Sequence, residues 1–122
     1  MVLFYIMENE TNKNYCPAQE AFKVLANKWS LMIIKELSSE KMRFNAIKKK
    51  IDGISSRELS KRLEVLEQIG AINRKIISIK PIMVEYSLTE AGNELTDAIE
   101  ILHDWTIKNK KNIKQIEKSS HI

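Results

Sequence analysis

Apolar residues recur at helical spacing along the first half of the chain. Three stripes with intervals of three or four residues predict three consecutive helices; they consist of Ala21, Val24 and Leu25, of Trp29, Ile33 and Leu37, and of Phe44, Ile47 and Ile51. Pro17 opens the first helix, because a proline at the first helical position removes no helical hydrogen bond. The dipeptide Asp52-Gly53 then predicts a turn.

A fourth helix is predicted after this turn. Ser55 and Glu58 have the spacing of a capping box, in which the hydroxyl accepts from a free backbone N–H and the carboxylate reaches back to the N–H of the cap. The helix should run to about Gln68 and stop at Gly70. At 100° per residue its leucines fall within about 60° of one another and must face the core. The opposite side carries Arg57, Ser60, Lys61, Glu64 and Gln68.

The pattern changes after Gly70 from helical to alternating. Residues 71–79 are rich in isoleucine and predict a strand, which Lys80-Pro81 interrupts because proline has no N–H for a ladder. The alternation of Val84, Tyr86 and Leu88 with polar residues predicts a second strand. Two such strands around a proline-containing break predict a β-hairpin.

A long final helix follows, with Thr89 as its cap. Its broad apolar face consists of Leu95, Ala98, Ile99, Leu102 and Trp105. Beyond Thr106 the chain becomes polar, and the tail either continues the helix through Ile113 and Ile116 or frays.

Charge is distributed unevenly over the 122 residues. The formal net charge of the whole chain is +4, yet residues 41–62 alone carry eight Lys or Arg against Asp52 and Glu58. Residues 81–107 carry six acids and no Lys or Arg. A basic cluster opposed by an acidic segment elsewhere favours a polyanion partner over a merely solvated face.

The order of helices and hairpin is the winged helix-turn-helix pattern, and a series of short motifs makes the resemblance specific. The motifs are Cys16-Pro17, Lys28-Trp29, Arg43-Phe44-Asn45, Gly53-Ile54-Ser55-Ser56-Arg57, Leu59-Ser60, Arg62-Leu63, Leu66, Gly70, Pro81, Val84-Glu85-Tyr86-Ser87-Leu88-Thr89 and Gly92. Over roughly residues 16–105 the chain resembles the HxlR-type transcriptional regulators, a MarR-like group of small winged-helix proteins.

The resemblance implies an α+β, mainly α, fold with a two-stranded wing and a long C-terminal dimerisation helix. We expect one domain over residues 1–122, with a DNA-binding core at 16–88, dimerisation elements at 1–15 and 89–116, and a tail at 117–122. Two departures stand out. Ala26-Asn27 replaces the glycine pair common in the family, where asparagine tolerates left-handed backbone. Ile82-Met83 replaces a basic residue of the wing.

The capped helix has the length and the polar face to enter a DNA major groove. Arg57 can pair bidentately with guanine, whereas Lys48, Lys49 and Lys50 are expected to hold phosphates. Arg62 either contacts a phosphate or pairs with an acid. The complete set of predicted DNA contacts is Arg43, Lys48, Lys49, Lys50, Ser55, Ser56, Arg57, Ser60, Lys61, Arg62, Lys75 and Lys80. The alternative is a solvated helix without a nucleic-acid partner.

The apolar face of the final helix is broader than a three-helix core requires. We expect Leu95, Ile99, Leu102 and Trp105, together with the apolar segment at residues 1–7, to pack in a twofold homodimer, as the resemblance implies. The alternative is that both segments fold back on their own core. Residues 1–7 are far too short to span a bilayer, so no membrane association is expected.

Cys16 is the only cysteine, which excludes an internal disulfide framework and indicates a reducing, cytoplasmic environment. At the start of a helix the free N–H groups and the helix dipole favour a thiolate. The resemblance implies a redox or electrophile sensor at this place. The alternative is a structural cap that packs against Tyr15 or the final helix.

Enzymatic readings have little support, because two histidines and three glycines supply neither a zinc site nor a phosphate-cradling loop. No cofactor and no metal are expected. The sequence therefore predicts a DNA-binding transcriptional regulator, a repressor acting as a homodimer on a twofold symmetric operator, with a small-molecule or oxidant effector left open. The alternative is a winged-helix protein-interaction module, which the lysine-rich segment disfavours because protein interfaces are depleted in lysine.

Overall fold

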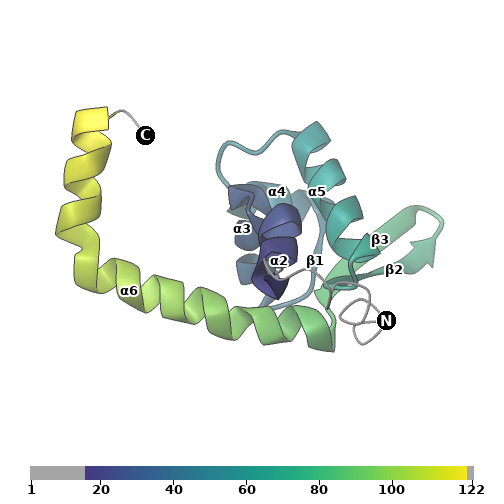
Figure 1. Ribbon diagram of the computed structural model, residues 1–122. Helices are drawn as coiled ribbons and strands as arrows, with labels where there is room; N and C mark the ends of the chain where they lie inside the picture. Colours follow the sequence, from purple (N-terminus) through teal and green to yellow (C-terminus); the bar gives the residue numbers. More distant parts are fainter. Residues whose placement is uncertain (1–15, 121–122) are drawn as a thin grey trace.

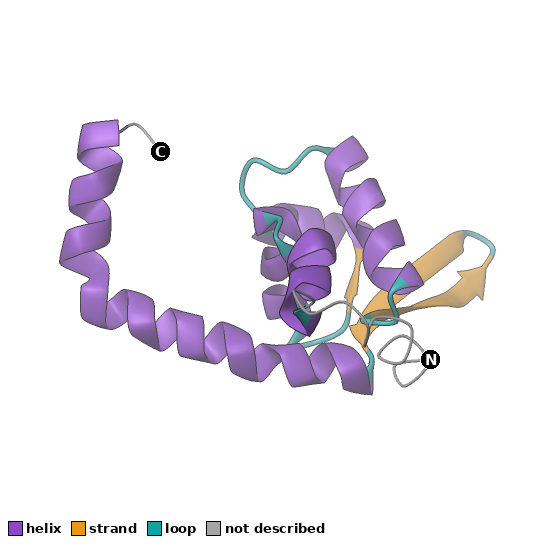
Figure 2. Cartoon of the chain, viewed as in Figure 1, coloured by secondary structure: helices purple, strands orange, loops and turns teal. Residues whose placement is uncertain are grey.

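The computed structural model describes residues 16–120 and the side chains of residues 16–116 (Figure 1). The elements in chain order are α2 (Pro17–Leu25), α3 (Lys28–Leu37), β1 (Met42–Arg43), α4 (Phe44–Lys50), α5 (Ser56–Gln68), β2 (Ile72–Ile79), β3 (Ile82–Leu88) and α6 (Glu90–Ser120). Figure 2 shows a mainly helical molecule from which the β2–β3 hairpin projects to one side. The predicted α+β, mainly α, winged-helix arrangement is confirmed.

Helix α3 begins at an asparagine that caps it. The Asn27 side chain accepts a hydrogen bond from the backbone N–H of Trp29 at 2.9 Å. Asn27 has φ −138°, so it lies in extended backbone and the left-handed conformation that asparagine tolerates is not used. The short α2–α3 connection survives without glycine because a side-chain cap replaces a backbone turn.

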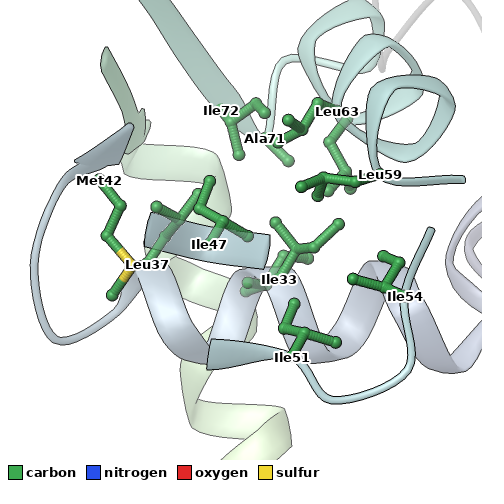
Figure 3. Close-up of a cluster of buried hydrophobic side chains, with 12 residues drawn as sticks. Ile33, Leu37, Met42, Ile47, Ile51, Ile54, Leu59, Leu63, Ala71 and Ile72 are labelled. Atoms are coloured by element: carbon green, nitrogen blue, oxygen red, sulfur yellow. The ribbon is translucent and has the colours of Figure 1, made fainter. Parts of the chain in front are cut away.

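The core lies between α3, α4, α5 and the base of the hairpin (Figure 3). Ile33, Ile34, Ile47, Leu59 and Leu66 have no exposed surface. Helix α2, in contrast, buries none of its residues, and Phe22 remains 63% exposed. The apolar stripe predicted for α2 therefore lies on the surface of the single chain, with only Leu25 packed against the core.

The sheet has one strand more than expected. β1 pairs antiparallel with β3, Met42 opposite Tyr86, which gives the order β1-β3-β2. The hairpin itself spans Ile72–Ile79 and Ile82–Leu88, so the second strand starts two residues earlier than its alternation indicates. A bulge interrupts the register between Ile76 and Ser78. The two-stranded wing is thus the outer part of a three-stranded sheet whose base is tied to α4.

Helix α6 is anchored where it leaves the hairpin. The Thr89 hydroxyl accepts from the N–H of Gly92 at 3.0 Å and donates to the carbonyl of Gly70 at 2.5 Å, which confirms Thr89 as a cap. The backbone N–H of Thr89 also donates to the carbonyl of Ala71 at 3.1 Å. The helix then runs along α3 and bends at Asn109, whose φ of −115° and ψ of 16° are not helical (Figure 1). Of the two alternatives for the tail, the helix continues, as far as Ser120.

Candidate DNA interface

The N-terminus of α5 is fixed by its cap. The Ser55 hydroxyl accepts from the N–H of Glu58 at 3.0 Å, which is the serine half of the predicted capping box. Leu59, Leu63 and Leu66 of this helix are buried, as expected. Because these three leucines fix the rotation of α5, its other side must face solvent, and Arg57, Ser60 and Lys61 are all exposed there.

A complete capping box also needs a hydrogen bond from the backbone N–H of Ser55 to the Glu58 carboxylate. The hydrogen bonds of the described residues do not include it. Instead, Oε1 of Glu58 lies 3.4 Å from Nε of Arg62, one turn along the helix. The Arg62 side chain is only 17% exposed. Of the two roles open for Arg62, the pair with an acid is therefore present, and a phosphate contact stays a prediction.

The other predicted basic contacts have no acidic partner among the described side chains. Within residues 16–116, none of them forms an ion pair; they are Arg43, Lys48, Lys49, Lys50, Arg57, Lys61, Lys75 and Lys80. Apart from the half-buried Lys48, all are exposed. Cations without intramolecular partners can neutralise phosphates without first breaking a salt bridge, so this surface is electrostatically suited to nucleic acid.

Two hollows lie between α5 and the neighbouring elements that carry basic residues. A cleft of about 640 Å³ lies between α4 and the start of α5 and is lined by Asn45, Lys48, Lys49 and Ser55 among others. A second hollow, of about 460 Å³, lies between α5 and the hairpin. Helix α5 thus borders α4 at its start and the hairpin along its later turns.

The second hollow contains a residue that sequence reasoning missed. Arg74 lines it together with Ser60, Glu64 and Tyr86. The register places Arg74 opposite Tyr86, on the sheet face that turns toward α5. The sequence did not indicate a basic residue next to α5 at this place, because Arg74 lies outside the dense basic cluster at 41–62.

The exposed charge on α5 changes sign along the helix. Its first two turns carry Arg57 and Lys61, whereas its exposed second half carries Glu64 and Glu67. Glutamates repel phosphates, so the N-terminal half is the end that can approach a DNA backbone closely. This matches the geometry of recognition helices, whose N-terminal residues contact base edges.

The residues predicted for dimerisation fall into two groups. Leu95 and Ile99 are half-buried against the core of their own chain, and their contact with a partner chain stays a prediction. Leu102 and Trp105 are each 55% exposed. Leu95, Ile99 and Leu102 of α6 line an apolar groove of about 340 Å³, whose other side consists of Phe22 on α2 and Leu31 on α3 among others. The apolar segment at residues 1–7 lies outside the described residues.

Cys16 stands at the N-cap of α2, as predicted. It is exposed, and its side chain makes no capping hydrogen bond; only its carbonyl accepts, from the N–H of Gln19 at 2.9 Å. The Cys16 side chain thus supplies no capping hydrogen bond, and the packing against Tyr15 that the structural alternative names lies outside the described residues. The thiol is accessible for reaction.

Residues 16–120 contain neither a metal-binding cluster nor a membrane-spanning helix. No cluster of three or more His, Cys, Asp or Glu side chains able to hold a metal ion occurs in this range. None of the described helices combines the length and the apolar character needed to cross a membrane.

Proteins of similar sequence support the assignment of this surface to DNA binding. Residues 24–114 match the family model described as HxlR-like helix-turn-helix. YtfH of Escherichia coli, described as an uncharacterized HTH-type transcriptional regulator, is 36% identical over 90 residues, which are 74% of this chain and 71% of that protein.

Solved structures agree in fold. A MarR-family regulator from Porphyromonas gingivalis has a TM-score of 0.74 and 31% identity, covering 80% of this chain and 96% of the other. The redox regulator HypR in its reduced form has a TM-score of 0.77 and 28% identity, covering 82% and 99%. The chain therefore belongs to the HxlR-like family of winged helix-turn-helix transcriptional regulators, which bind DNA.

Proposed function

We propose that this protein is a homodimeric repressor that binds a twofold symmetric operator and places α5 in the major groove. The observation that carries the proposal is the unpaired basic surface around a capped helix. Eight Lys or Arg side chains on β1, α4, α5, β2 and the hairpin turn have no ion pair within the described part of the chain.

Within this surface the residues have different roles. Arg57, on the first turn of α5, reads guanine through two parallel hydrogen bonds, and Ser56, Ser60 and Lys61 contact neighbouring bases or phosphates. The basic residues of α4, with Arg43 before it, anchor phosphates. Arg62 contacts a phosphate only through guanidinium nitrogens that do not face Glu58.

Dimerisation follows from the size of the interface. A single small wing domain makes too few contacts for a useful specificity, whereas two copies read half-sites about 10 bp apart. Leu102 and Trp105, exposed next to the apolar groove, supply the contact between copies, with the half-buried Leu95 and Ile99 behind them. A dimer bound over a promoter blocks transcription, which makes repression the simplest outcome.

We propose further that Cys16 responds to oxidants. Its thiol is exposed, and the similar protein HypR is described as a redox regulator. With one cysteine per chain the products are a disulfide between subunits, a mixed disulfide with a small thiol, or an adduct. Because α2 borders the groove proposed for dimer contact, such a change alters the spacing of the two recognition helices. A DNA-binding regulator of this kind acts in the cytoplasm.

Selection of binding sites from random DNA tests the main proposal. We expect recovery of a palindromic sequence and steep loss of binding as salt rises, because phosphate neutralisation releases counterions. Arg57→Ala should cost about 1–3 kcal/mol of DNA-binding free energy and relax the base preference at one operator position. Lys49→Ala should weaken binding to all DNA sequences and lower the slope of binding against salt by about one.

Two results would contradict this assignment. Equal, sequence-independent losses from both variants would remove Arg57 as a reader of bases. Absence of DNA binding, or binding that scarcely depends on salt, would instead favour a protein-interaction module.

A further inference from the structure

Helix α6 is divided by charge into an acidic first part and a basic end. From Glu90 to Asp104 it carries five acids and no lysine or arginine, whereas residues 108–116 carry four lysines and no acid. All nine side chains are exposed. Within the described side chains the only ion pair on α6 joins Asp104 to its neighbour His103, so the lysines and the other four acids have no partner there.

The acids form a stripe along the solvent side of the helix. At 100° per residue four of them fall within about 80° of one another. They are Glu90, Glu94, Asp97 and Asp104. This acidic stripe lies opposite Ile99, which packs against the core of its own chain. Ile101, 70% exposed, lies within the stripe, and Trp105 borders it. Charged and apolar groups that both lack a partner thus share one surface of α6.

The basic end follows a bend in the helix. At Asn109 the backbone leaves helical geometry, and the Asn109 side chain donates to the carbonyl of Trp105 at 2.9 Å. We call residues 110–116 the arm. Figure 1 shows the arm turning away from the first part of α6 and standing apart from the other helices. Helical spacing places Lys110, Lys111 and Lys114 on one side of the arm and its two isoleucines on the other.

A second copy of this chain fits both charged surfaces at once. The arm requires an anionic partner, and the acidic stripe requires a cationic one. The bend directs the arm away from the stripe of its own helix (Figure 1). In a twofold dimer each copy offers the same surfaces, so the arm of one copy can meet the stripe of the other in two equivalent contacts. DNA would suit the arm alone and would leave the acidic stripe without a counterpart.

The exposed apolar side chains of α6 indicate where two copies meet. Leu102 and Trp105 are the side chains already proposed for the dimer contact. In an antiparallel pair centred between them, each residue after the centre lies against a residue equally far before it on the other copy. Lys110 of one copy is then near Asp97 of the partner subunit, and Lys114 is near Glu94 of the partner subunit. A parallel pair would instead place acids against acids and lysines against lysines.

We propose that the arm of each subunit binds the acidic stripe of its partner, and that this contact makes the two α6 helices pair antiparallel. Opposite charges beside an apolar seam set partner choice and orientation. The charge pattern of α6 is complementary to its own copy only when that copy is reversed, so the chain selects itself as partner. This inference rests on the proposed homodimer and deepens it.

Exchanging the charges tests this pairing. In sedimentation at low salt, K110E/K114E and E94K/D97K should each dimerise about tenfold more weakly than the wild type, because each places like charges across the contact. An equimolar mixture of the two variants should regain the wild-type affinity, since each arm then meets the opposite charge on its partner. High salt should reduce all these differences, because the charges are exposed to solvent.

E64K/E67K is the matched control. Glu64 and Glu67 are exposed on α5 and have the same spacing as Glu94 and Asp97, so this variant makes an equal change of charge away from α6. It should dimerise as the wild type does. Thermal unfolding of all variants checks their fold, which the exposure of the substituted side chains should leave intact.

The outcomes separate this inference from the dimer on which it rests. If both charge variants dimerise as the wild type does, or if their mixture is no better than either alone, the contact between arm and stripe is overturned while the dimer stands. Full dimerisation of K110E/K114E with loss of DNA binding would also overturn it and assign the arm to DNA. A wild-type protein that sediments as a monomer would overturn both proposals.

Discussion

Gly92→Ala is expected to destabilise the protein although alanine is the better helix former. Gly92 lies in the first turn of α6, buried against the residues that precede β2. A Cβ atom at this position would lie 1.9 Å from the carbonyl oxygen of Ala71 and 2.9 Å from its carbonyl carbon. Both atoms belong to backbone and cannot rotate away, so α6 must retreat by more than about 1 Å to reach ordinary contact.

The magnitude follows from what this retreat breaks. Two hydrogen bonds of Thr89, to the carbonyls of Ala71 and Gly70, hold the start of α6 and contribute about 1 kcal/mol each. Crowding of a packed site costs about 1–3 kcal/mol, and the gain in helix propensity returns about 1 kcal/mol. The free energy of unfolding should therefore fall by about 2–4 kcal/mol.

Thermal and urea unfolding followed by circular dichroism measure this change. The midpoint temperature should drop by about 10 °C. Asn93→Ala is the control, because Asn93 is the exposed neighbour of Gly92 in the same helical turn, and its effect should stay within about 0.5 kcal/mol. A Gly92→Ala protein at least as stable as the wild type would refute the argument, since it would show that α6 does not need this close approach.

Three further predictions concern single side chains. Ser30→Ala should raise the free energy of unfolding by about 1 kcal/mol in urea titrations, because the fully buried Ser30 hydroxyl has no hydrogen-bond partner among the described residues. Trp105→Glu should convert dimers to monomers in sedimentation at micromolar concentration; a wild-type monomer would contradict the dimer. Diamide treatment should change operator affinity in the wild type but not in Cys16→Ser, and unchanged binding after oxidation would leave Cys16 without a sensing role.

The helices of the core were predictable because each one carries its own signal. In α5 the buried leucines recur at helical spacing and Ser55 marks the start, so both its limits and its rotation followed from local residues. β1 carried no such signal. It has two residues, and it exists only because Met42 meets Tyr86, more than forty positions along the chain. The surface position of α2 was equally unpredictable, because an apolar stripe shows which face of a helix is apolar but not which element covers that face.

The candidate site was predictable as a cluster of charge but not as a set of contacts. The concentration of Lys and Arg at 41–62 indicated α4 and α5 from the sequence alone. The pairing of Arg62 with Glu58 needed side-chain geometry to separate it from a phosphate contact, although the four-residue spacing was visible. Arg74 required the strand register, which a bulge shifts in a way that alternation does not predict.

The short strand β1 changes the thermodynamics expected for binding. It ties β3 to the residue before α4, and Lys41 next to it pairs with Glu85 on β3 at 3.6 Å. The base of the wing is therefore held from both sides, by β1 on one edge and by the packing of β2 against α5 on the other. A wing fixed in this way loses little conformational entropy when it meets DNA, so less of its contact energy is cancelled by ordering. The protein should then bind DNA nearly as a rigid body, and electrostatic attraction rather than folding of the wing should set the association rate.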